Sequence, residues 1–179
     1  PRAAVAAYDE AVEKAARGFR RDPTGRWADD ALFIMGRAWF RTGELSRALQ
    51  ALEEARARTD DPELRRGATL YLGAARTRLG EGLEALVLLN EAMRGLPSGS
   101  LAAEGHFWRG VLHLDLGRRD QGLWDLERAA EADPAYRVPA LMQRVAHGVA
   151  AADTTMVGLA VRSLSTTPAG AAQADSLDT

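Results

Sequence analysis

The stretch LFIMGRAWFRTGELSRALQALEEA, residues 32–55, decides the fold of this chain because its pattern returns twice at one fixed interval. The residues that keep a step of 37 are Gly36, Gly73 and Gly110; Gly43, Gly80 and Gly117; Leu52, Leu89 and Leu126; and Ala55, Ala92 and Ala129. A fixed period between about 20 and 50 residues is typical of a repeat array. We therefore predict helical hairpins that stack on copies of themselves.

The repeated residues suit the physical needs of a stacked hairpin, which cannot bury its apolar stripe alone. At the crossing of the two helices a side chain would push them apart, and we expect Gly36, Gly73 and Gly110 there. The glycines at 43, 80 and 117 are expected to end each first helix in a left-handed conformation. The leucines at 52, 89 and 126 are expected to fill the hairpin cores.

Composition limits the classes of function. Of the 179 residues 46% are hydrophobic, which permits a packed core and argues against global disorder. A net charge of -2 with a pI near 6.0 gives no basic footprint for nucleic acid. There is no cysteine, hence no disulfide framework. The nearest candidate for a membrane span, Val145 to Val161, is interrupted by Asp153 and is rich in Ala, Gly and Thr, and no run reaches the length that a span needs.

The period divides the chain into one repeat domain, residues 1–164, and a tail. We expect the second helix of a truncated repeat at 1–23, repeats at about 27–60, 63–97 and 101–134, and a divergent C-terminal hairpin at 137–164. The unpaired face of the first segment is expected to be covered by something upstream. The last residues, 165–179, are small and polar without periodicity, and we predict a disordered tail.

These residues resemble the tetratricopeptide repeat family. Its pattern corresponds to Leu32, Met35–Gly36, Trp39, Ala48, Leu52 and Ala55; then to Leu72–Gly73, Ala85, Leu89, Ala92 and Pro97; then to Arg109–Gly110, Gly122, Leu126, Ala129 and Pro134. The period of 37 exceeds the family's usual length of about 34, and the aromatic positions weaken to Arg76 and His113. The resemblance implies an all-α fold, a right-handed α-solenoid of stacked antiparallel helix hairpins.

The same resemblance implies a concave groove, lined by the first helix of each hairpin, that holds a segment of another protein. The groove residues would be Phe33, Arg37, Phe40, Arg41, Leu70, Tyr71, Arg78, Phe107 and Trp108. Aromatic residues and arginine often dominate protein interfaces. The alternative is that aromatics such as Phe33 and Phe107 pack between neighbouring hairpins. The clamp with which some family members hold a C-terminal carboxylate is absent, since Lys14 and Asn90 lie off the groove.

A narrower resemblance bears on location. The string WADDALFIMGRAWFRTGELSRAL is similar to repeats of periplasmic and outer-membrane lipoproteins of the barrel-assembly and Tol-associated type. It implies a periplasmic or outer-membrane-associated protein, with the cytoplasm as the alternative location. The chain starts at Pro1, which indicates a removed leader or a fragment.

The sequence carries no pattern for catalysis or for a cofactor. It lacks a phosphate-binding GxxxxGK, an HExxH and a GxSxG motif, so we predict that the protein is not an enzyme. His106 and His113 are seven residues apart and share a helix face, but no cysteine or third ligand joins them. Zinc sites need three or four ligands, and we therefore predict no metal.

Two main hypotheses for function remain, beside a third in which the tail at 165–179 lies in the groove and regulates binding. The first is a non-catalytic scaffold of a bacterial multi-protein assembly that binds a partner segment in the groove. The second is a structural subunit of a larger complex or homo-oligomer that uses its N-terminal helix or its convex face. Solution mass separates them, because a stable oligomer that buries Tyr8 and Val12 favours the second.

Overall fold

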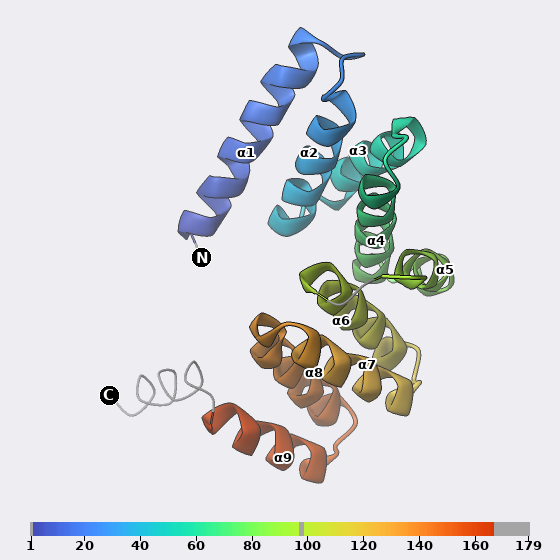
Figure 1. The fold of residues 1–179 in the computed structure, drawn as a ribbon. Coiled ribbons are helices and arrows are strands. Elements are labelled where there is room, and N and C mark those ends of the chain that lie inside the picture. Colours follow the sequence, from blue (N-terminus) through green and yellow to red (C-terminus); the bar gives the residue numbers. More distant parts are fainter. Residues whose placement is uncertain (1, 97–98, 167–179) are drawn as a thin grey trace. The chain divides into compact units, whose positions relative to one another are not determined.

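The computed structural model of the chain describes residues 2–96 and 99–166, and within these ranges it holds helices and no strand (Figure 1). The helices are α1 (Arg2–Arg21), α2 (Ala28–Thr42), α3 (Leu45–Arg58), α4 (Pro62–Arg78), α5 (Gly82–Met93), α6 (Ser100–Asp115), α7 (Arg119–Ala132), the 3₁₀ turn η1 (Pro134–Tyr136), α8 (Arg137–Ala150) and α9 (Thr154–Ser165). The predicted all-α class of helix hairpins is confirmed.

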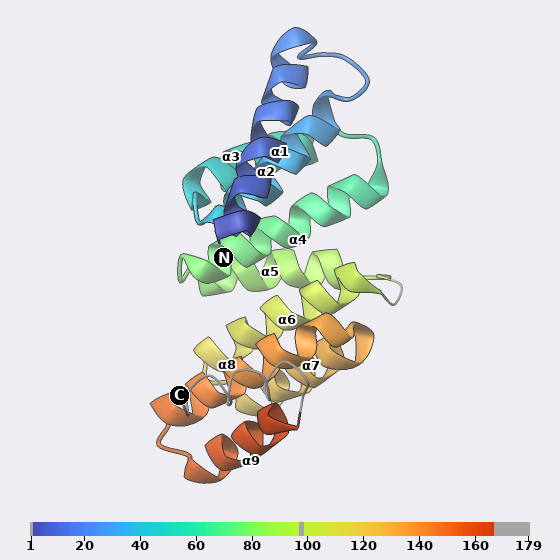
Figure 2. The same cartoon turned by 90° about the vertical axis from the view of Figure 1, so that its left-hand side faces the viewer.

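The chain divides into two compact units, Pro1–Arg94 and Gly95–Thr179, and each is described by itself. The repeat domain that the spacing predicts over 1–164 therefore stays a prediction as one continuous unit. In the first unit α2 pairs with α3, and α4 with α5, while α1 packs against α2 (Figure 2). The first helices α2 and α4 also contact each other, as do α3 and α4.

Glycine lets the two helices of each hairpin in the first unit approach closely. A Cβ atom added to Gly36 would lie 2.6 Å from Cγ of Leu52, and one added to Gly73 would lie 2.8 Å from Cγ of Leu89. Both leucines are fully buried. Any side chain at these glycines would overlap the leucine opposite, so the residue pair sets the distance between the helices.

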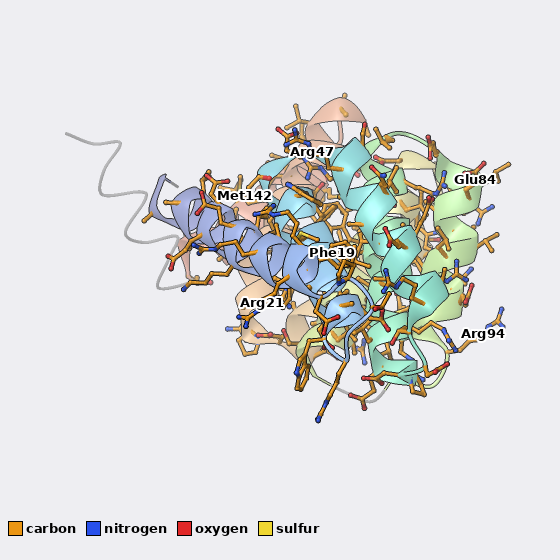
Figure 3. All side chains as sticks on the ribbon, turned by 90° about the horizontal axis from the view of Figure 1, so that it is seen from above. Phe19, Arg21, Arg47, Glu84, Arg94 and Met142 are labelled. Atoms are coloured by element: carbon orange, nitrogen blue, oxygen red, sulfur yellow. The ribbon has the colours of Figure 1, made fainter. Side chains whose placement is uncertain are left out.

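An apolar cluster joins α1 to the first complete hairpin. Its buried members are Leu32, Met35, Ala51, Ala55 and Leu64. From α1, Val12, Ala15, Ala16 and Phe19 pack against it. Phe19, labelled in Figure 3, also lies under the guanidinium of Arg58, 5.6 Å from Cζ to the ring centroid. The amphipathic helix predicted at the N-terminus thus uses one face to cover α2 and α3.

The second unit pairs α6 with α7 and α8 with α9, and α7 packs against α8 (Figure 1). Its core contains Phe107, Leu114, Leu126, Ala129 and Ala140. A Cβ atom added to the third glycine of the series, Gly110, would lie 3.0 Å from Cγ of Leu126. The third hairpin therefore repeats the glycine–leucine contact of the first two.

Glycine, aspartate and proline residues account for the ends of several helices. Gly43, Gly80 and Gly117 have positive φ angles of 92°, 77° and 71°, as predicted, because glycine adopts this conformation without a Cβ penalty. Asp61 caps α4 by accepting a hydrogen bond from the Glu63 amide at 2.8 Å, with proline next in the chain.

The last helix, α9, ends at Ser165, one residue past the predicted end of the C-terminal hairpin. Residues 167–179, which make up most of the predicted disordered tail, lie outside the described residues. Among the described helices, none combines the length and the hydropathy that a bilayer crossing requires.

Candidate functional site

Several residues of the predicted groove are buried in the first unit. Phe40 is 1% exposed, Leu70 0% and Tyr71 3%. The Tyr71 ring packs edge-on against Phe33 and Phe40 of α2, with ring centroids 5.9 and 5.6 Å away. Because these side chains fill the space between α2 and α4, a partner does not reach them in this conformation. Their direct contact with a partner is not supported.

The exposed remainder is a surface on α2 and α4 formed by Phe33, Arg37, Arg41 and Arg78, which we call the arginine face. Phe33 is half-buried, and its ring lies 5.9 Å from Cζ of Arg37. Arg78 donates a 2.8 Å hydrogen bond to the Phe40 carbonyl, and its Cζ lies 5.3 Å from the Phe40 ring. The half-buried Phe33 and the buried Phe40 thus each hold a guanidinium group at the surface through a cation–π contact.

Two predicted groove residues belong to the second unit. Phe107 is buried, and its ring contacts Trp108 at 5.3 Å and Tyr136 at 5.5 Å between centroids. Trp108 is half-buried. Phe107 therefore packs in the core between α6 and η1. This agrees with the alternative prediction that the residue packs between neighbouring hairpins. The groove as a whole stays a prediction.

A buried charged cluster connects α6 with α7. The carboxylate of Asp125, 2% exposed, accepts hydrogen bonds from Nη2 and Nε of Arg109 at 2.7 and 2.9 Å. Its Oδ1 also lies 2.7 Å from Nδ1 of His106. His113 completes the cluster, with Nε2 3.9 Å from Oδ2 of the same aspartate. Paired and hydrogen-bonded in this way, a charge can be buried in a core.

The cluster shifts two pKa values. Burial raises the pKa of Asp125, but the hydrogen bonds from His106 and Arg109 and the charge of Arg109 outweigh burial, so the pKa lies below the ordinary carboxyl value. Burial lowers the pKa of His113; Asp125 opposes this shift, whereas Arg109 and Arg118 add to it. Asp125 is therefore ionised and His113 neutral near pH 7.

The sequence pattern placed both histidines on one helix face but did not single out Asp125. Comparison of equivalent positions in the three repeats could have found it. Asp125 stands where the earlier repeats have Ala51 and Leu88, and Arg109 stands where they have Met35 and Leu72. A carboxylate and a guanidinium that replace apolar residues at two core positions of one hairpin indicate an internal ion pair. Within the described residues, no group of three or more histidine, cysteine or acidic side chains could hold a metal ion.

Stability of the chain is expected to fall as the pH drops below about 6.5, in part through His113. Its folded-state pKa is lower than its unfolded value, so the unfolded state binds the proton first. The stability that neutral His113 provides is complete above the unfolded pKa and decreases as the pH falls through that value towards the folded one.

The comparison is between thermal unfolding at pH 7.5 and at pH 5.5, followed by circular dichroism. A His113→Phe variant removes the titrating ring, and Nδ1 of His113 has no hydrogen-bond partner to lose. We expect a smaller acid-induced fall in Tm for this variant. Equal falls in both proteins would contradict the assignment.

Comparison with known proteins bears on the fold. No protein-family model matches the sequence, and none of the curated proteins does. Among solved structures, that of MamA superimposes with a TM-score of 0.59 at 17% identity, over 87% of this chain and 84% of MamA. A MamA structure titled RS-1 ArsTM double mutant gives 0.58 at 19%, over 89% and 88% of the two chains. A tetratricopeptide repeat protein from Parabacteroides merdae gives 0.62 at 19%, over 89% of this chain and 66% of that protein.

These similarities show that the chain has the fold of tetratricopeptide repeat proteins. The period of 37 and the polar third repeat are departures within that fold. The resemblance to periplasmic and outer-membrane lipoproteins, and the location it implies, stay predictions.

Proposed function

We propose that the chain is a non-catalytic interaction module whose first unit binds an acidic segment of a partner protein on the arginine face. The proposal depends on one observation. In the described part of the chain, no carboxylate forms an ion pair with Arg37 or Arg78, although both guanidinium groups are held over aromatic rings. Arginine held in this way is suited to recognising carboxylates and contributes strongly at interfaces.

The surroundings of the face support an acidic ligand. Other arginines of the first unit already have carboxylate partners: Arg56 pairs with Glu91 at 2.9 Å, and Arg76 pairs with Glu81 at 2.6 Å. These arginines thus have carboxylate partners within the chain, whereas Arg37 and Arg78 have none among the described residues, and Arg78 bonds only the Phe40 carbonyl. An acidic segment of a partner would pair with the two guanidinium groups, and an apolar side chain of the same segment would pack on the Phe33 ring.

Peptides selected from a random display library on the immobilised chain are expected to be rich in Asp and Glu around an apolar residue. Their affinity should fall with rising salt, since exposed charges are screened. Arg37→Glu should weaken binding by about tenfold, which corresponds to about 1.4 kcal/mol. Fluorescence anisotropy of a labelled peptide measures both effects.

The matched control is Arg47→Glu, which makes the same charge change at an exposed arginine of α3 (Figure 3). Its side chain lies 3.8 Å from Glu44 and belongs to α3, which contributes no residue to the arginine face. Any loss of peptide affinity in Arg47→Glu should be no larger than the effect of the changed net charge alone. Selection of basic or neutral peptides, or equal losses in the two variants, would remove the proposal.

A further inference from the structure

The first unit has an open apolar cleft at its N-terminal end, between α1 and α2. The cleft has a volume of about 530 Å³. Ala11, Ala15 and Gly18 line it from α1, and Trp27, Ala31 and Ile34 line it from the start of α2. Trp27 is 65% exposed and Ile34 41%, although both are large apolar side chains. Exposed apolar surface gathered in a concave site marks a place for a ligand or partner.

The repeat register shows what lies at this place elsewhere in the same chain. One repeat after Ala11, Ala15 and Gly18 come Ala48, Leu52 and Ala55 of α3. All three are 0% exposed, and α3 packs against the first helix α2 of its own hairpin. The cleft side of α1 is therefore the face that a first helix covers one repeat later.

The α2 wall of the cleft gives the same result. One repeat after Trp27, Ala31 and Ile34 come Leu64, Ala68 and Tyr71 of α4, which are all buried. Tyr71 receives the rings of Phe33 and Phe40 from α2. At the position of the cleft, a first helix would thus contact α1 and α2 together, as α2 contacts α3 and α4.

We propose that this cleft is the docking site for an amphipathic α-helix of a partner protein, which binds in the register of a first repeat helix. The residues that line the cleft include none of the arginine face, so the site does not depend on that face. The helix would bury Ile34 and Trp27 and would pair with α1, which otherwise has no hairpin partner among the described helices.

The cleft also indicates which kind of side chain the docking helix carries where it crosses α1. In the complete hairpins this residue is glycine, because a Cβ at Gly36 would lie 2.6 Å from Cγ of Leu52. At the cleft, Ala15 stands in the position of Leu52 and leaves space in place of the leucine side chain. The partner helix should therefore present a bulky apolar residue where the repeats present glycine.

A second side chain follows from Asp30, which also lines the cleft. Asp30 stands one repeat before Gly67, and Cζ of Phe33 lies 3.0 Å from the Cβ position of that glycine. A phenyl ring in this position of the docking helix would meet the carboxylate of Asp30. A basic side chain would pair with it instead.

These features favour a different polypeptide over a second copy of this chain. The first helices α2, α4 and α6 carry Gly36, Gly73 and Gly110 at the crossing point and already pair with α3, α5 and α7. Within the part of the chain that the structure describes, these first helices therefore present no bulky residue at the crossing point. A partner helix with a basic residue, then a bulky apolar residue three positions later, meets the requirement.

The probe is a labelled peptide of residues 27–43 with Phe33→Arg, made in two versions: with glycine at position 36, and with Gly36→Leu. The proteins are the full chain and its Ala15→Leu variant, which restores the leucine found in α3. We expect the leucine peptide to bind the wild-type chain about tenfold more tightly than the glycine peptide. In Ala15→Leu the order of affinity should reverse.

Ile34→Asp tests the α2 wall, with Leu159→Asp as the control at a similarly exposed aliphatic residue of the second unit. Ile34→Asp should reduce binding of the leucine peptide by about tenfold or more, and Leu159→Asp should leave it unchanged. Circular dichroism establishes that each variant is folded; if Ala15→Leu does not fold, the Ile34 and Leu159 pair decides.

The proposal is overturned if neither peptide binds saturably, or if both bind the wild-type chain and Ile34→Asp equally. It is also overturned if the chain is a dimer that Ile34→Asp dissociates, since the occupant is then a second copy. Loss of acidic-peptide binding in Arg37→Glu has no bearing on this result, so the two proposals fail separately.

Discussion

The Asp125→Ala variant is expected to destabilise the second unit by about 3–5 kcal/mol. Asp125 is 2% exposed and accepts both hydrogen bonds of the Arg109 fork, with His106 on the same carboxylate. Removing it leaves a guanidinium in the hairpin with its main counter-charge missing. The large effect comes from the lost pairing of that guanidinium and not from the volume of the lost side chain.

The same chain supplies the control for this prediction. In the second repeat, the positions of Arg109 and Asp125 are occupied by Leu72 and Leu88. The double variant Arg109→Leu with Asp125→Leu removes both charges together and is expected to recover most of the loss, because a buried ion pair often adds little beyond apolar packing. A double variant as unstable as Asp125→Ala would contradict this explanation.

Tryptophan fluorescence isolates the second unit in this measurement. Trp27 and Trp39 belong to the first unit, so their replacement by phenylalanine leaves Trp108 and Trp124 as reporters. Urea titration of this background, with and without each variant, gives the change in unfolding free energy. At acid pH the wild-type chain should approach the variant, since the stability from ionised Asp125 is lost as the pH falls from its unfolded pKa, about 3.9, through its lower folded value.

The helix hairpins were predictable because each fixes its own geometry with residues close in sequence. Gly36 meets Leu52 within one hairpin, and the same spacing joins Gly73 to Leu89. A glycine and a leucine at a constant separation therefore report a local crossing of two helices. No information about neighbouring hairpins was needed for that step.

The candidate site was less predictable because its exposure depends on neighbouring hairpins. Phe40 and Tyr71 had the right residue types for an interface, but they pack against each other between α2 and α4. The repeat period predicts which face of its own helix a residue lies on. It does not predict how the next hairpin is rotated, and this rotation decides whether the residue is exposed. Asp125 was visible as a polar residue in an apolar register, but only the structure shows that three side chains of α6 converge on it.

The Leu89→Ala variant is expected to lose about 2–5 kcal/mol of stability in the first unit. Leu89 is 0% exposed, and its Cγ lies 2.8 Å from the Cβ position of Gly73. Alanine leaves a cavity at the point where α4 and α5 cross, and the buried surroundings close it only partly. Gly73→Ala alone should cost about 1–3 kcal/mol, because the new methyl group overlaps the leucine.

Combining the two substitutions tests whether the pair sets the helix spacing. In the double variant the added methyl group at position 73 enters the space that the leucine side chain left, so the loss should be smaller than the sum of the single losses by at least about 1 kcal/mol. Trp27 and Trp39 report on this unit when Trp108 and Trp124 are replaced by phenylalanine.

A third substitution separates steric contact from the general effect of removing glycine from a helix. Gly18→Ala changes a helical glycine of α1 whose Cβ would have no atom within 4 Å, and it should stabilise the unit by up to about 1 kcal/mol. If Gly73→Ala were stabilising as well, or if the double variant lost the full sum, the crossing would not depend on a close glycine–leucine contact. The docking cleft relies on the same contact, with Ala15 in place of the leucine, so this cycle also tests the steric basis of that proposal.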